Sequence, residues 1–220
     1  MQPKQFLTKI RKAYLEARKP TISIKRIKRG TSRSISSIAE DLFASYLEPM
    51  LPRDYEIWID PQITIKNLKN KSGKRSFLFR PDICIISCKT NRIEMIFDIK
   101  MDLGYKRNKF IQQVEDRIIE LNKIIKHTAK CSLKEKDDEL TFSNTLKWNY
   151  VVLSEHNITT EQYDKVKRWF ANTEKAALFT LSRGEHLNTY SDDLELHPNH
   201  DDFKRIATSI ETLSVTKKKI

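Results

Sequence analysis

The sequence contains little glycine and few cysteines, and it has no long apolar segment. Its 220 residues include 4 glycines and 3 cysteines, with no repeat or low-complexity tract, which indicates a globular composition. Cys84, Cys88 and Cys131 are odd in number and widely spaced. This pattern favours a reducing compartment over a disulfide framework. No apolar run approaches the length of a membrane span.

The first residues also lack the apolar core of a signal peptide, so we expect a cytoplasmic protein with no membrane contact. The length corresponds to one domain of ordinary size and is sufficient to bury a hydrophobic core. Hydrophobic residues make up 39% of the chain and charged residues 32%. We therefore expect one globular domain with, at most, a small appendage.

Acidic residues are scarce in the first thirty positions, where Glu16 is the only one. Ten basic residues share this segment: Lys4, Lys9, Arg11, Lys12, Arg18, Lys19, Lys25, Arg26, Lys28 and Arg29. Such a concentration of positive charge predicts a surface that binds a polyanion. A helix that only improves solubility is the alternative interpretation of the same residues.

Apolar spacing predicts an α/β fold. Helical periodicity covers about 4–18, 35–48 and 107–127, and a further helix follows Thr159 or Thr160. Strand patterns occupy "YEIWI" with "QITIK", then "SFLFRPDICIIS", "RIEMIFDIKM", "WNYVVLSE" and "KAALFTLS", and "CKTN" joins the second to the third as a tight hairpin. This order predicts a three-strand meander and later crossover strands in a mixed central sheet flanked by helices.

Three charged residues interrupt the apolar hairpin. Strand side chains alternate, so Asp98 and Lys100 share a face about 6–7 Å apart, and Ile93, Met95, Phe97 and Ile99 take the other face. The register of the hairpin can place Asp82, on the preceding strand, beside Asp98. Two carboxylates held together favour Mg²⁺ or Mn²⁺. A nearby lysine can position the attacking water and offset charge on a phosphate.

These residues resemble the motif of the PD-(D/E)xK nuclease superfamily. Pro81-Asp82 is followed, after fifteen residues, by Asp98-Ile99-Lys100, with aspartate in the middle acidic position. The order of elements from about 35 to 154 is similar to the αβββαβ core of the restriction-endonuclease-like fold. The resemblance implies a nuclease core over 34–182, a basic N-terminal helical arm over 1–33 and a C-terminal extension over 183–220. It also implies a metal-binding acid on the first core helix, which corresponds to Glu40.

The resemblance implies an Mg²⁺-dependent endonuclease that cuts double-stranded DNA, similar to a homodimeric type II restriction enzyme, with Mn²⁺ able to substitute. Asp82, Asp98, Lys100 and Glu40 are then the catalytic residues, and Asp82, Asp98 and Glu40 the metal ligands. We expect basic residues to contact DNA, namely Lys25, Arg26, Lys28, Arg29, Arg33, Lys106 and Arg107.

Several alternatives remain open. Asp98 and Lys100 can form a plain surface ion pair. Glu40 follows Ser37 by three residues, so the two residues can instead form a capping box at the start of the helix. At the level of function, the alternatives are a nuclease that resolves Holliday junctions or cuts transposon ends, or a non-catalytic nucleic-acid-binding protein on the same fold. No sequence feature identifies the bases that would be read.

Overall fold

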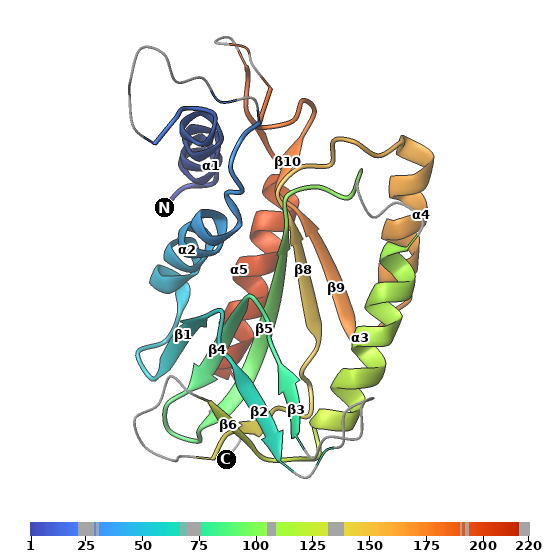
Figure 1. Cartoon of the computed structure of the whole chain (residues 1–220). Coiled ribbons are helices and arrows are strands. Elements are labelled where there is room, and N and C mark those ends of the chain that lie inside the picture. The colour runs from blue at the N-terminus through green and yellow to red at the C-terminus, as the bar shows by residue number, and fades with distance from the viewer. Residues whose placement is uncertain are drawn as a thin grey trace.

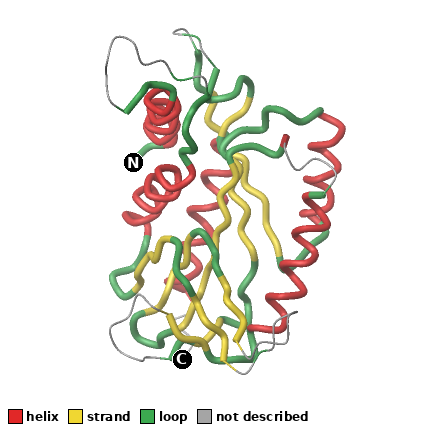
Figure 2. Tube along the Cα trace, viewed as in Figure 1, coloured by secondary structure: helices red, strands yellow, loops and turns green. Residues whose placement is uncertain are grey.

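The computed structural model describes residues 1–21, 29, 31–66, 68, 76–104, 109–131, 139–189, 191 and 194–215. Within these residues the chain forms an α/β fold with a mixed central sheet between two layers of helices (Figures 1 and 2). The predicted α/β class is therefore confirmed. The five α-helices are α1 (Pro3–Ala17), α2 (Ser36–Leu47), α3 (Phe110–Ile124), α4 (Thr160–Ala171) and α5 (His200–Val215), and a 3₁₀ turn, η1 (Glu48–Met50), follows α2.

The central sheet has six strands among the described residues. Five run in the order β1 (Tyr55–Ile59), β4 (Ile83–Ser87), β5 (Arg92–Lys100), β8 (Trp148–Val152) and β9 (Ala176–Thr180), and β7 (Thr141–Phe142) pairs with the start of β5. The first three form an antiparallel meander, whereas β5, β8 and β9 are parallel. The predicted meander and crossover strands are both present, and the predicted turn at 88–91 joins β4 to β5.

An irregularity in β5 redistributes its side chains between the two faces of the sheet. The pairing with β4 shifts between Ile85 and Ile86, which leaves Glu94 as an extra residue in β5. Met95, Phe97 and Ile99 face one hydrophobic cluster, whereas Ile93 belongs to the cluster on the opposite face. The expectation that Ile93 shares the face of the other three was therefore wrong, because strict alternation does not continue through a bulge.

Each face of the sheet carries its own helices and core. One cluster combines α1, α2 and α5, and the other combines α3, α4 and a small second sheet (Figure 1). Phe6, Leu7 and Ile10 of α1 are fully buried in the first cluster, as are Ile206 and Ile210 of α5. Parts of the two segments predicted to lie outside the core domain, 1–33 and 183–220, thus pack against the central sheet.

The segment "SFLFRPDICIIS" forms two strands instead of one. β3 (Ser76–Phe79) pairs with β2 (Ile63–Lys66), which pairs with β6 (Ala129–Cys131), whereas β4 joins the central sheet. The break falls at Arg80–Asp82, where Pro81 has no N–H to donate to a neighbouring strand. Asp82 therefore lies in the bend before β4, and its expected position within a strand was wrong.

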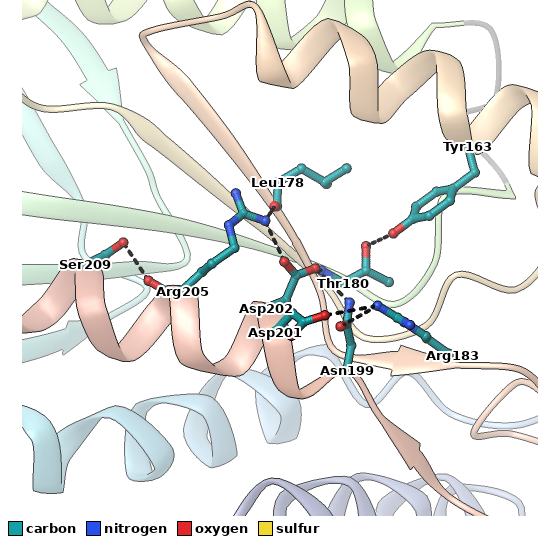
Figure 3. Close-up of polar contacts among 9 residues, drawn as sticks. All are labelled: Tyr163, Leu178, Thr180, Arg183, Asn199, Asp201, Asp202, Arg205 and Ser209. Carbon is teal, nitrogen blue, oxygen red and sulfur yellow. Dashed lines mark hydrogen bonds and ion pairs between the residues drawn. The ribbon is translucent and has the colours of Figure 1, made fainter.

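The first turn of α5 is attached to the far edge of the sheet by a polar network (Figure 3). Asp202 is 8% exposed, and its carboxylate accepts hydrogen bonds from the backbone N–H of Thr180 at 2.8 Å and from Asn199 Nδ2 at 3.0 Å. Arg205 Nη1 donates to the same carboxylate at 2.5 Å and to the carbonyl of Leu178 at 3.2 Å. This buried charge is fully partnered, so the network stabilises the docking of α5. A further short pair, β10 (Ser182–Arg183) with β11 (His197–Pro198), precedes the helix.

The predicted helices agree with the structure to within a few residues. Thr159 caps α4, and its side chain forms the reciprocal capping box with Gln162. None of the helices in the described ranges is long and apolar enough to cross a membrane.

Candidate active site

The register of β4 and β5 brings Asp82 and Asp98 together. Ile83 pairs with Phe97, so Asp82 stands across from Asp98 at the next position. The backbone N–H of Ile99 donates to Asp82 Oδ2 at 2.6 Å, which holds this carboxylate against the end of β5. The negative charge of Asp98 acts directly on the carboxyl group of Asp82. The juxtaposition expected from the hairpin is therefore found.

Lys100 completes this group from the same face of β5. Its ammonium is ion-paired with Asp98 Oδ1. The side chains are 23% exposed for Lys100 and 14% for Asp98. Both values are too low for the plain surface pair considered from the sequence. A partly buried pair experiences less screening by water and salt than an exposed one.

Burial, followed by the negative charge of Asp98, raises the pKa of Asp82 from an ordinary 3.8 to about 7. The hydrogen bond from Ile99 and the charge of Lys100 act in the opposite direction but do not prevail. Near neutral pH the carboxylate pair therefore favours binding of a proton or another cation, because two adjacent negative charges repel each other.

Glu40 lies on α2 within the electrostatic range of this group. Burial and the charges of Asp60 and Asp41 raise its pKa, Lys100 lowers it, and Asp98 adds a smaller increase. The capping alternative was wrong, because α2 begins at Ser36 with Ile35 as its N-cap and has no side-chain cap. Ser37 lies inside the helix and not at its N-cap, so it cannot form a capping box with Glu40. The role of Glu40 as a metal ligand stays a prediction.

Asp60 is a neighbour that the sequence reasoning missed. It follows β1, adopts a positive φ of 46°, and its N–H donates to the carbonyl of Asp82 at 2.8 Å. Its position depends on the pairing of β1 with β4, two strands separated by more than twenty residues. The only local indication is an aspartate before a proline at the end of a strand pattern, which by itself indicates a turn.

The described residues contain no group of three or more His, Cys, Asp or Glu side chains placed to hold a metal ion. A two-carboxylate site still fits Mg²⁺, which uses one or two protein carboxylates and takes its other ligands from water and substrate phosphate. The hard oxygen donors and the mutual repulsion of Asp82 and Asp98 are the features that fit such an ion.

A cavity of about 450 Å³ opens beyond the end of β5, and its lining includes Arg33, Asp102, His156 and His186. Nδ1 of His186 accepts a hydrogen bond from the N–H of Asn188 at 2.9 Å, so its proton is on Nε2, 3.4 Å from Asp102 Oδ2. Burial is the main cause that lowers the pKa of His186. Residues 102 and 186 are far apart in the sequence, which gave no indication of this pair.

The predicted DNA contacts fall mostly outside the described residues: Lys25, Arg26, Lys28, Lys106 and Arg107. Arg29 is described and donates to the carbonyl of Thr31 at 3.4 Å. Arg33 donates from its guanidinium to the carbonyl of Glu16 in the last turn of α1 at 3.0 Å and to Thr21 Oγ1, just beyond the helix, at 2.6 Å. Its exposed guanidinium thus lies beside the cavity that follows Lys100.

The fold and this group of charges define an α/β protein with a paired-carboxylate site at the end of its central sheet. Comparison with known proteins found no matching family model, no similar curated protein and no similar solved structure.

Proposed function

We propose that the protein is a metal-dependent endonuclease that hydrolyses DNA phosphodiester bonds. The observation that carries the proposal is that Asp82, in the bend just before β4, lies beside Asp98 of β5, with Lys100 ion-paired to Asp98 on the same face. The motif resemblance described above supports the finer proposals of a restriction-endonuclease-like fold and of a homodimeric, sequence-specific, type II restriction enzyme.

In this proposal Asp82 and Asp98 hold Mg²⁺, for which Mn²⁺ can substitute. The ion, when bound, supplies a Lewis acid for the phosphate and lowers the pKa of a water molecule. Lys100 then orients the attacking water and stabilises the negative charge that develops on the phosphate. Ile99 contributes through its backbone N–H, which fixes the carboxylate of Asp82 in place.

Glu40 is proposed as a third metal ligand, because the charges of Asp98 and Lys100 both shift its pKa. Arg33 and Arg29 are proposed to contact the DNA backbone, together with the predicted basic residues outside the described ranges. Such phosphate contacts position the duplex without reading its sequence.

The test measures cleavage of supercoiled plasmid, linear duplex and four-way junction DNA, with Mg²⁺, with Mn²⁺ and with excess EDTA. We expect cleavage only with metal and none by Asp98→Asn, which should still bind DNA. Asp164→Asn, an exposed change on α4, is the matched control and should cut normally. Cleavage by Asp98→Asn at the wild-type rate, or full activity in EDTA, would refute the proposal. Faster cleavage of the four-way junction than of linear duplex would favour a junction-resolving nuclease over a restriction enzyme.

A further inference from the structure

The outer side of β1 is an open edge of the central sheet. Among the described residues β1 pairs only with β4, and Figure 1 shows it at the margin of the sheet beside α2. Asp60 donates to the carbonyl of Asp82, and Cys88 donates to the carbonyl of Asp54. In an antiparallel pair every second residue bonds to the partner. The backbone N–H and C=O groups of Ile57 and Ile59 therefore point outward, where a further strand can bind.

A groove of about 790 Å³ runs along this edge, between β1 and α2. Its apolar lining includes Ala44, Leu51, Ile57 and Ile59, which also pack against the core behind them. The groove therefore combines an open hydrogen-bonding strand edge with an apolar contact surface. These two features are the requirements for adding an extended peptide to a sheet.

The rim of the groove is acidic. Asp41 and Glu48 are exposed on it, Glu56 is exposed beside it with its Oε2 accepting a hydrogen bond from Trp58 Nε1 at 3.0 Å, and Arg53 is the only cation among its lining residues. This polarity contrasts with a chain whose formal net charge is +12. Phosphate groups would be repelled here, so the groove is unsuited to nucleic acid. Two copies of the chain joined edge to edge would also bring like charges together, which opposes a symmetric pair through β1.

We propose that this groove binds an extended segment of a partner protein in which apolar residues alternate with lysine or arginine, and that the segment adds to the sheet as a strand beside β1. Its apolar side chains pack on Ala44, Leu51 and Ile57. Its cations meet the carboxylates of the rim. At about 3.3 Å per residue, the five residues of β1 accommodate a segment of about five to seven residues. The inference does not depend on the nuclease proposal.

The probe is a fluorescent seven-residue peptide of alternating lysine and valine, titrated against the full chain and followed by fluorescence anisotropy. Two copies of the probe, N-methylated at the valines or at the lysines, test the backbone pairing, because one of these sets must donate to β1. Glu48→Lys reverses a charge at an exposed position and leaves the apolar surface unchanged. Glu174→Lys is the matched control, exposed in the turn before β9 at the opposite edge of the sheet.

We expect saturable binding that Glu48→Lys weakens about tenfold, since it replaces an attraction by a repulsion. Glu174→Lys should change the affinity less than about twofold, and one of the methylated copies should fail to bind. The proposal is overturned if the wild-type protein does not bind the probe, if Glu48→Lys binds it equally well, or if both methylated copies bind like the parent. A wild-type dimer that Ser45→Arg dissociates in sedimentation also overturns it, because a second copy would then fill the groove.

Discussion

Replacing Asp82 by asparagine should stabilise the metal-free protein above neutral pH. In the folded state the carboxyl pKa is raised from 3.8 to about 7, so the folded protein binds this proton more tightly than the unfolded chain. The resulting stability is fully present below the unfolded pKa and is lost as the pH rises through about 7. Near pH 8 the folded protein carries a buried charge that asparagine would remove.

The size of the effect follows from the two pKa values. Their difference corresponds to about 4 kcal/mol of unfolding free energy near pH 8. Asparagine keeps an acceptor for the N–H of Ile99, but a neutral acceptor is weaker by about 1 kcal/mol. The net gain of about 2–3 kcal/mol corresponds to an increase in Tm of about 4–12 °C for a chain of this length.

Thermal unfolding followed by far-UV circular dichroism, without metal, measures this gain. We expect Asp82→Asn to unfold at a higher temperature than the wild type near pH 8 and at nearly the same temperature near pH 4, where the aspartate is protonated in the folded state. Asp164→Asn, at an exposed site, should match the wild type at both pH values. An equal gain at both pH values, or a lower Tm near pH 8, would refute the assignment of Asp82 as a destabilising carboxylate. Adding Mg²⁺ should narrow the gap, because only the wild type has the complete carboxylate pair.

Three further changes test other parts of the structure. Lys100→Met should reduce the rate of DNA cleavage at least about a hundredfold without loss of metal affinity in calorimetry, because the lysine stabilises charge and is not a metal ligand. A cleavage rate within about threefold of the wild-type rate would contradict this role. Glu40→Gln should lower cleavage while the Tm stays equal or rises slightly, since burial disfavours the charged form; unchanged cleavage would remove Glu40 from the site. Asp202→Ala should cost about 2–4 kcal/mol in urea unfolding, because it leaves the donors of Thr180 and Asn199 without this acceptor, whereas Asp202→Asn should cost less.

The sequence was sufficient to predict elements whose periodicity is local. The stripe of α3 and the capping residues of α4 depend on neighbours within one or two turns, so their spacing alone identified them. The separation of β3 from β4 was missed, although Pro81 provided a local signal for it. α5 was also missed, although Phe203, Ile206, Ile210 and Leu213 recur at helical spacing after Asn199.

The site was predictable only in part, for a related reason. Asp82, Asp98 and Lys100 lie on one hairpin, so a short turn and a single register decide whether they meet. Asp60 and the pair formed by Asp102 and His186 depend on contacts between distant segments, which no spacing rule encodes. The bulge at Glu94 could not be predicted either, because the pattern of apolar residues does not show where a strand contains an extra residue.

The contact between the first and last helices has a consequence for the order of events during synthesis. Phe6 on α1 packs against Phe203 on α5, with ring centroids 6.1 Å apart. α1 is synthesised before the other described helices, and Phe6 can pack on Phe43 and Tyr46 once α2 has emerged, whereas its contact with Phe203 must wait for α5. The sheet and the α3–α4 side can assemble on the emerging chain, whereas the core beneath α1 closes only after α5 has left the exit tunnel. During that interval the part of the α1 surface that α5 covers is available to chaperones.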